Sequence, residues 1–172
     1  MKKYIKGYIK FILVFCLIFL FCSLIIDWHR DGVILRDGSY SLNTNFKADT
    51  FRLAVDVADG KEEEGLRLQL WPANYSSAQQ FTLENVQGNE YIIWFGSLCV
   101  GVNDETQGVV LQTYEGQKAQ HWYIDRINTS QYFKITNCES GLSMQISKEP
   151  NYYYYTIKVS QYLGSEYYYF QF

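Results

Sequence analysis

Residues 68–81 read LQLWPANYSSAQQF, and this stretch decides the expected fold. Leu68 and Leu70 fall on one side of an alternating pattern, which is typical of a β-strand with one face toward a core. Trp71 falls on the opposite face, which favours a surface role, with packing in the core as the alternative. A polar loop follows and leads to the letters QQF, where a second strand is expected to begin.

The same spelling returns twice, in weaker form, later in the chain. QLW at 69–71 is followed by QTY at 112–114 and SQY at 160–162, and QQF at 79–81 is followed by QHW at 120–122 and YYF at 168–170. The intervals are 43 and 48 residues for the first motif and 41 and 48 for the second. Two motifs that keep step through three copies indicate an internal repeat. We expect three repeats of about four strands each, at about 37–87, 88–128 and 129–172, which share one core.

The part of the chain beyond residue 27 shows no sustained helical period, and short β-branched and aromatic runs recur instead. The runs are RLAVDV, LRLQLW, QQFTL, YIIWFG, GVVLQTY, HWYID, YFKIT, TIKVSQY and YYYFQF. Turns that contain Gly, Asn, Asp or Ser separate them, which predicts an all-β domain. We expect the closing aromatic residues Phe81, Trp122 and Phe170 to lie in the core.

The N-terminus is of a different kind. Four lysines precede an uncharged apolar run of 16 residues, Phe11–Ile26, which is the pattern of a secretory signal or a signal anchor. As a helix this run spans about 24 Å, a little short of the hydrocarbon core. Bulky Ile25 and Ile26 stand where a cleavage site needs small residues, so we favour an uncleaved anchor in residues 1–26. A linker at 27–36 and a domain at 37–172 would then lie outside the cell, with a secreted form as the alternative.

Charge excludes one class of partner. The chain has 15 basic and 18 acidic side chains, and four of the basic ones lie in the first 26 residues, which contain no acid. The remainder therefore has 11 basic against 18 acidic side chains, a formal charge of −7. Such a domain has no dominant basic patch, so we expect no nucleic-acid partner.

Cysteine usage is sparse outside the apolar run. Cys99 and Cys138 lie 39 positions apart, which makes neither a disulfide framework nor a zinc site. They could pair outside the cell, yet we expect the stability of the domain to depend little on a disulfide.

Catalytic and metal-binding patterns are weak. Neither His29 nor His121 stands in a recognisable arrangement of nucleophile and base, and no feature supports a glycosidase, so we expect no catalysis. The acidic run Glu62–Glu64 is interpreted as a solvated turn, because its spacing does not fit a calcium loop. We expect no metal and no cofactor. The tyrosine runs Tyr152–Tyr155 and Tyr167–Tyr169 fit either strand surface or a contact face for a partner.

Three repeats with the pattern Gln-x-aromatic and a closing Gln-x-Trp, complete or weakened, make the chain resemble the ricin-B-type lectin domain, a β-trefoil. The first repeat, RLAVDVADGKEEEGLRLQLWPANYSSAQQF, is the nearest match, and the resemblance covers residues 37–172. It implies an all-β fold and a shallow sugar pocket near the start of a repeat.

The resemblance assigns a role to four residues of repeat one. Asp56 would accept hydrogen bonds from two adjacent sugar hydroxyls, and Trp71 would stack on the apolar face of the sugar. Gln79 would hold the Asp56 side chain in place, and Gln69 would line the pocket. Physical chemistry agrees, because a pyranose offers a face of C–H groups that suits an indole and hydroxyls that suit a carboxylate.

The chain departs from the family pattern in several places. The asparagine usual before the closing Gln is Ala78 here, and Asn74 or Tyr75 is the candidate substitute. Repeat two has Gly101 in place of the aspartate, although Gln112, Tyr114 and Gln120 remain. Repeat three has Gln145 in that place and Tyr168 in place of the closing Gln. We expect repeats two and three to be structural, with one sugar site in repeat one.

Two hypotheses of different class remain at this point. The first is a lectin module at the cell surface, or secreted, that binds a glycan of galactose or xylose type. The second is a β-trefoil scaffold for a protein partner, such as a toxin or enzyme subunit made from a separate chain.

Overall fold

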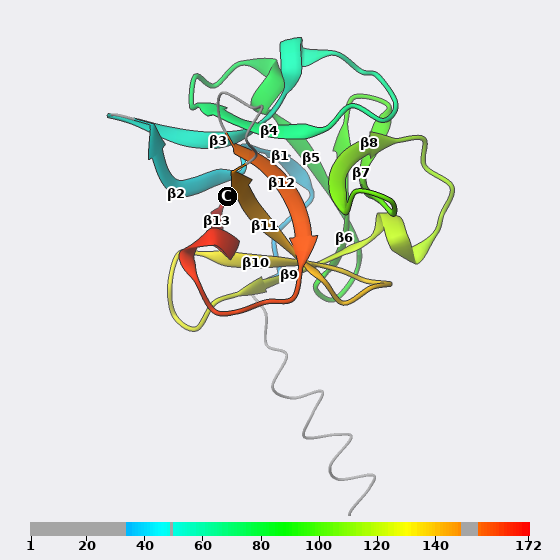
Figure 1. Ribbon diagram of the computed structural model, residues 1–172. Coiled ribbons are helices and arrows are strands. Elements are labelled where there is room, and N and C mark those ends of the chain that lie inside the picture. Colours follow the sequence, from blue (N-terminus) through cyan, green and yellow to red (C-terminus); the bar gives the residue numbers. More distant parts are fainter. Residues whose placement is uncertain (1–33, 49, 149–154) are drawn as a thin grey trace, which may run out of the picture. The chain divides into compact units, whose positions relative to one another are not determined.

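The computed structural model describes residues 34–48, 50–148 and 155–172 (Figure 1). The chain divides into two units, residues 1–31 and 32–172, and every described residue lies in the second. The expected anchor at 1–26, His29 and most of the first tyrosine run fall outside the described residues. Within the described ranges, no helix is long and apolar enough to cross a membrane.

The described part of the second unit consists of β-strands and short 3-10 turns, so the all-β prediction is confirmed. The strands are β1 (Gly38–Tyr40), β2 (Asn43–Ala48), β3 (Phe51–Val57), β4 (Leu68–Pro72), β5 (Phe81–Gln87), β6 (Glu90–Phe95), β7 (Leu98–Asn103), β8 (Gly108–Gln112), β9 (Trp122–Arg126), β10 (Phe133–Asn137), β11 (Ser143–Lys148), β12 (Tyr155–Ser160) and β13 (Phe170–Gln171). The 3-10 turns are η1 (Ala58–Gly60), η2 (Ser77–Gln79), η3 (Lys118–Gln120) and η4 (Glu166–Tyr168).

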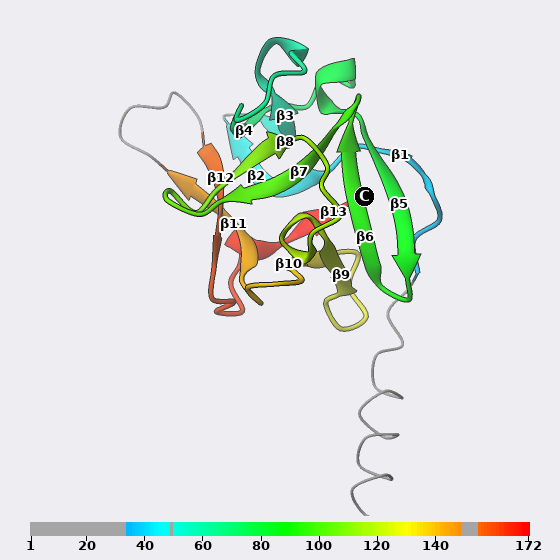
Figure 2. The same ribbon diagram turned by 90° about the vertical axis from the view of Figure 1, so that its right-hand side faces the viewer.

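Strand pairing closes into a ring. Antiparallel pairs run from β5 to β6, β6 to β9, β9 to β10, β10 to β13 and β13 to β2. β1 and β2 share one place in this ring, because β1 pairs with β5 while β2 pairs with β13. Figure 2 shows the long β5–β6 hairpin on the side of the ring where β1 joins it. A closed ring leaves few unpaired strand edges, which protects the sheet from edge-to-edge association.

Three further hairpins, β3–β4, β7–β8 and β11–β12, complete the sheet (Figure 1). They meet through β12, in which Thr156 pairs with Gln69 of β4 and Lys158 pairs with Gly108 of β8. Strands β1–β5, β6–β9 and β10–β13 thus repeat one plan of ring strand, hairpin and ring strand.

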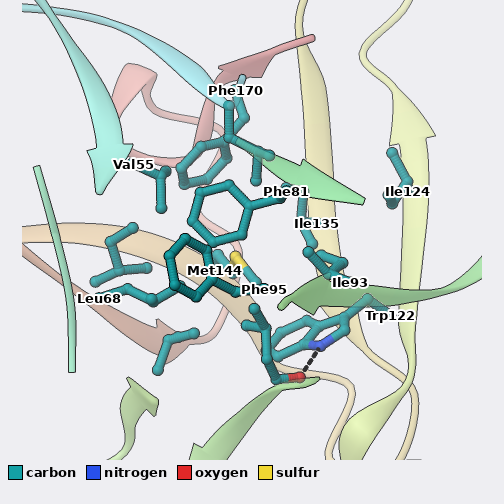
Figure 3. Packing of buried hydrophobic residues seen from close by; sticks show 14 of the residues in the cluster. Val55, Leu68, Phe81, Ile93, Phe95, Trp122, Ile124, Ile135, Met144 and Phe170 are labelled. Carbon is teal, nitrogen blue, oxygen red and sulfur yellow. Dashed lines mark hydrogen bonds between the residues drawn. The ribbon is translucent and has the colours of Figure 1, made fainter. Parts of the chain in front are cut away.

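The closing aromatic residue of each repeat is fully buried, as predicted. Phe81, Trp122 and Phe170 each have no exposed surface, and the core seen in Figure 3 gathers around them. Trp122 also satisfies its one polar group, because Nε1 donates to the carbonyl oxygen of Val100 over 2.8 Å (Figure 3). Burial of each such side chain contributes about 2–3 kcal/mol to folding. Within the described ranges no disulfide bond stabilises the domain, since both Cys99 and Cys138 are free thiols.

Candidate functional site

An open hollow of about 560 Å³ lies over the β3–β4 hairpin of repeat one. Its lining consists of Asp56, Ala58, Asp59, Gly60, Gln69, Trp71, Asn74, Ser76, Ser77 and Ala78. Four of the five predicted site residues, Asp56, Gln69, Trp71 and Asn74, are therefore brought together in one place. The fifth, Gln79, is buried and hydrogen-bonds the Asp56 side chain.

Strand register explains why these side chains meet. Asp56 of β3 pairs directly with Gln69 of β4, and residues paired in this way project from the same face of a sheet. Leu68 and Leu70 are buried on the other face, so alternation carries Trp71 to the side of the hollow. Trp71 is 39% exposed, and the alternative that it packs in the core is wrong.

The Asp56 carboxylate is held at both oxygens. Gln69 Nε2 donates to Oδ1 over 2.9 Å, and Gln79 Nε2 donates to Oδ2 over 3.1 Å. Gln79 is itself fixed, because its Oε1 accepts the backbone N–H of Asn74 over 2.9 Å and its Nε2 also donates to the carbonyl of Pro72 over 3.1 Å. Each carboxylate oxygen has two lone pairs, so both keep acceptor capacity for a ligand.

Burial makes this carboxylate costly for the fold. Asp56 is 4% exposed, and desolvation raises its pKa above the ordinary value of 3.8. The amides of Gln69 and Gln79 oppose that rise in the pKa, and the nearby charge of Asp59 adds to it. Because the folded protein disfavours the ionised form, Asp56 lowers rather than raises the stability of the domain at neutral pH.

Asn74, and not Tyr75, stands at the hollow. Asn74 lines it, and its Oδ1 accepts the backbone N–H of Ser76 over 2.9 Å, which leaves Nδ2 as the group that can face a ligand. Tyr75 is 81% exposed and is not among the lining residues.

Asp59 is a lining residue that the sequence interpretation missed. It lies in η1, where Asp59 and Gly60 both have left-handed backbone conformations, with φ of 55° and 64°. The Asp-Gly pair was the available signal, since such pairs mark tight turns. This turn brings the loop after β3 over the hollow and adds a second carboxylate to its lining.

No family model matches the chain, and no curated protein matches it in sequence. Solved structures do match its fold. ThreeFoil, a designed protein with three-fold symmetry, has a TM-score of 0.67 and 18% identity, with 78% of this chain and 97% of that chain covered. A mosquitocidal holotoxin has a TM-score of 0.69 and 14% identity, and the Polyporus squamosus lectin has a TM-score of 0.63 and 16% identity.

The fold is a β-trefoil. The resemblance stated from the three repeats is therefore confirmed at the level of the fold. Sequence identities of 14–18% to these structures show the fold alone. The holotoxin and the Polyporus squamosus lectin each match 80% of this chain. This chain spans 17% of the holotoxin chain and 49% of the lectin chain.

Hydrogen bonds align repeat two with repeat one differently from the alignment that the QTY and QLW motifs predict. Gln120 donates to the carbonyl of Thr113 and accepts the N–H of Glu115, just as Gln79 bonds Pro72 and Asn74 in repeat one. These contacts match Gln112, not Tyr114, with Trp71. Matching QTY with QLW is therefore wrong by two residues, because the chain between the two motifs is two residues shorter in repeat two.

In repeat two, the side chain of Gln112 fills the space that corresponds to that of the Asp56 side chain in repeat one. Gly101 takes the place of Asp56, as predicted, but a Cβ built there would lie 1.9 Å from Gln112 Oε1. Gln112 Nε2 donates to the carbonyl of Val102 over 3.0 Å, which keeps the amide in that space. Tyr114 is engaged elsewhere and does not line the smaller hollow of about 190 Å³ that remains. Repeat two thus presents neither the carboxylate nor the aromatic face of repeat one.

Repeat three follows the same plan with other groups. The hydroxyl of Tyr168 donates to the carbonyl of Gln161 over 2.6 Å, which is the bond that Gln79 makes in repeat one. That contact matches Ser160 with Trp71, and strand register matches Gln145 with Asp56. Ser160 Oγ donates to Gln145 Oε1 over 2.7 Å, so the two positions bind each other.

The acidic run after β3 is exposed, as predicted, but it is more than a solvated turn. Glu62 Oε2 accepts the backbone N–H and the hydroxyl of Ser97 over 2.9 and 3.0 Å, and these bonds lower the pKa of Glu62. Glu64 accepts the N–H and hydroxyl of Thr113, each over 3.3 Å. The loop that follows η1 is therefore anchored to repeat two.

His121 belongs to a buried polar cluster. It is 7% exposed, with Nδ1 against the carboxylate of Glu90 and Nε2 bonded to the Tyr114 hydroxyl over 3.0 Å. Lys118 Nζ also contacts Glu90. The sequence interpretation missed this cluster because its members come from separate segments. Within the described ranges, no group of three His, Cys, Asp or Glu side chains could hold a metal ion.

Proposed function

We propose that this domain is a carbohydrate-binding module with one sugar site in repeat one. One observation carries the proposal: a buried carboxylate, oriented at both oxygens by Gln69 and Gln79, stands beside the exposed Trp71 in a single open hollow. This pair of groups suits the two chemical aspects of a pyranose, its hydroxyls and its C–H face.

The internal repeat supports a role in binding rather than in folding. The same position of the fold accepts Gly101 in repeat two and Gln145 in repeat three, so the β-trefoil does not need a carboxylate there. Likewise, Gln112 and Ser160 stand where repeat one has Trp71. A buried charge and an exposed indole that the fold does not require are best explained by a ligand.

Binding proceeds without a catalytic step in this proposal. Trp71 stacks on one face of the sugar, and the remaining lone pairs of Asp56 accept hydrogen bonds from two adjacent hydroxyls. Asn74 Nδ2 donates to a third group at the edge of the ring. A single shallow pocket makes few contacts, so the expected Kd is about millimolar, near −4 kcal/mol.

Structural neighbours support the ligand class. The Polyporus squamosus lectin, of which this chain spans 49%, is described as bound to a sialylated glycan epitope. We propose galactose- or xylose-type sugars for this chain, since an oriented carboxylate beside an indole suits vicinal hydroxyls on a neutral ring.

The test is a glycan array probed with the full-length chain, solubilised in a detergent without a sugar headgroup. Galactose, lactose and xylo-oligosaccharides then serve for calorimetric titration. Asp56→Asn is the matched control, because asparagine has the shape of aspartate without its charge. Binding that the wild type shows and the variant lacks supports the site, and binding that survives the substitution unchanged contradicts it.

A second candidate is a β-trefoil scaffold for a protein partner. The mosquitocidal holotoxin, of which this chain spans 17%, shows that the fold occurs inside a larger toxin. Large exposed side chains such as Phe51, Tyr75 and Leu163 favour a contact surface in this chain. Absence of binding to every glycan on the array would make this candidate the stronger one.

We also propose an extracellular place for the domain, either held by an uncleaved anchor in residues 1–26 or secreted. The lysines before an apolar run support it, as do the bulky residues at its end. Membrane fractionation with measurement of the N-terminal mass tests it, and a mature soluble form that begins between residues 23 and 40 would contradict the anchor.

A further inference from the structure

The hollow of repeat one is acidic. Two of its lining side chains, Asp56 and Asp59, are carboxylic acids, and the others are neutral, with no lysine, arginine or histidine among them. The two acids differ in setting, because Asp56 is 4% exposed whereas the side chain of Asp59 is 78% exposed. In the proposed sugar site the buried acid holds the ligand, and the exposed acid adds charge at the edge.

The two charges act on the same space. The charge of Asp59 contributes to the raised pKa of Asp56, after the larger effect of burial, so the two carboxylates lie close enough to interact. The partners of Asp56 are the neutral amides of Gln69 and Gln79, which orient its charge without cancelling it. A ligand in this hollow consequently meets a negative potential that the lining itself does not neutralise.

We infer that this site selects sugars by charge, and that Asp59 is the residue that determines the selection. The preferred ligands are aminosugars with a free, protonated amine, followed by neutral hexoses, while uronic and sialic acids are rejected. This inference rests on the proposed sugar site, and it adds to that site the class of sugar taken.

Lys61 weakens the negative potential that Asp59 adds to the hollow, but it does not remove it. Its Nζ lies 3.3 Å from Asp59 Oδ2, so the pair is partly neutralised. Both side chains are mostly exposed, at 62% and 78%, and Lys61 is not in the lining, so solvent weakens the pair. Lys61 and Asp59 should therefore shift the selection in opposite directions.

The expected ratio of affinities between charged and neutral sugars is modest, because the charges of the site are partly exposed to solvent. One protonated amine beside two carboxylates should bind about three- to tenfold more tightly than the corresponding neutral sugar at low salt. A sugar carboxylate should bind at least about threefold more weakly. Both differences should shrink at about 0.5 M salt, where the screening length is only a few ångströms.

The experiment is calorimetric titration of the full-length chain in a detergent without a sugar headgroup, at about pH 6, where sugar amines are protonated. The series is galactose, its 2-amino and 6-amino derivatives, N-acetylgalactosamine and galacturonic acid. The 2-amino and 6-amino groups lie at different edges of the sugar, so one of them can approach Asp59 whichever way the ring binds. N-acetylgalactosamine adds bulk at the 2-position without a charge.

Two variants supply the matched controls. Asp59→Asn keeps the turn, because Asn tolerates the left-handed conformation of residue 59, where φ is 55°. It should reduce the preference for amines, measured as the ratio of the amine affinity to the galactose affinity of the same variant, to about twofold or less. Lys61→Gln should increase the preference, since it removes the charge that partly neutralises Asp59.

Each outcome decides between the inference and the proposed function. If galactose binds, requires Asp56, and the amines bind no better, the inference is wrong and the sugar site stands. If the preference survives Asp59→Asn in full, Asp59 does not determine it and the inference is wrong. If no sugar in the series binds, the inference is wrong, and the proposed sugar site fails with it only when the glycan array and the xylo-oligosaccharides also show no binding.

Discussion

Gln69 lies directly opposite Asp56 across the β3–β4 hairpin, and its Nε2 donates to Asp56 Oδ1 over 2.9 Å. The second carboxylate oxygen is bonded by Gln79, so both partners are neutral amides. This arrangement fixes the direction of the carboxylate while its charge stays available. A salt bridge would have oriented the group equally well, but it would have cancelled the charge that ligand hydroxyls need.

Asp56→Asn should abolish sugar binding with no loss of stability. The Nδ2 group of asparagine would face Gln69, whose terminal amide can turn to present its oxygen, while Gln79 still donates to Oδ1. The free energy of unfolding should stay within about 1 kcal/mol of the wild type or rise, because the costly buried charge is gone. Chemical denaturation and calorimetric titration measure the two effects, and a large loss of stability would contradict the assignment.

Trp71→Ala should remove detectable sugar binding, whereas Trp71→Phe should retain part of it through its smaller ring. Trp71 is 39% exposed, so its loss should cost little stability. Trp122→Ala is the contrasting control, since Trp122 is fully buried and its removal should cost about 3–5 kcal/mol. Comparable losses of stability at Trp71 and Trp122 would show that Trp71 supports the core.

Gly101→Asp should fail to create a second sugar site. Gln112 Oε1 occupies the space of a Cβ at this position, at 1.9 Å, and the equivalent of Trp71 is Gln112 itself. Displacement of the amide and burial of a new charge should cost about 1–3 kcal/mol of stability. Titration should still give one site per chain, and a stoichiometry of two would disprove the alignment of repeat two.

Glu90 should make the domain sensitive to acid. Burial opposes the ionised form of Glu90, but the bonds from Lys118 and His121 outweigh it and lower the pKa below the ordinary 4.5. A lowered pKa means that the native state binds the proton less readily, so the stabilisation is present above about pH 4.5 and is lost as pH falls through the native value.

Glu90→Gln should therefore flatten the stability profile below that pH. Denaturation midpoints measured from neutral pH downward give the profile, and the exposed Glu105→Gln is the control. The same acid slope in wild type and Glu90→Gln would exclude this role for Glu90.

The two thiols should neither pair nor react readily in the folded domain. Burial raises the pKa of Cys99 to about 11 and that of Cys138 to about 12, so little thiolate forms at neutral pH. Reductant should shift Tm by less than about 2 °C, and alkylation should be slow until denaturant is added. A fall in Tm of more than about 10 °C with reductant would reveal a disulfide that contributes over 2 kcal/mol.

The sequence by itself determined the features that depend on local spacing. Alternation in the strands gave an all-β domain and the sides of Leu68, Leu70 and Trp71, because side chains in a strand have a period of two. Recurrence of the motifs gave three repeats and their buried closing aromatics. The resemblance to a known family, carried by the repeated motifs, named Asp56, Gln69, Trp71 and Gln79 in advance, and all four lie within repeat one.

Only the tertiary structure decided what depends on loop length and on contacts between repeats. The QTY motif matched Gln112 with Gln69, whereas the bonds of Gln120 match it with Trp71, two positions further on. The contacts of the closing Gln, and not the spelling of the motif, fix this alignment. The bonds from Glu62 to Ser97 and from His121 to Glu90 join segments more than 30 positions apart, and spacing along a chain carries no signal for such pairs. Asp59 was missed for another reason, because a left-handed turn, and not a strand period, sets its direction.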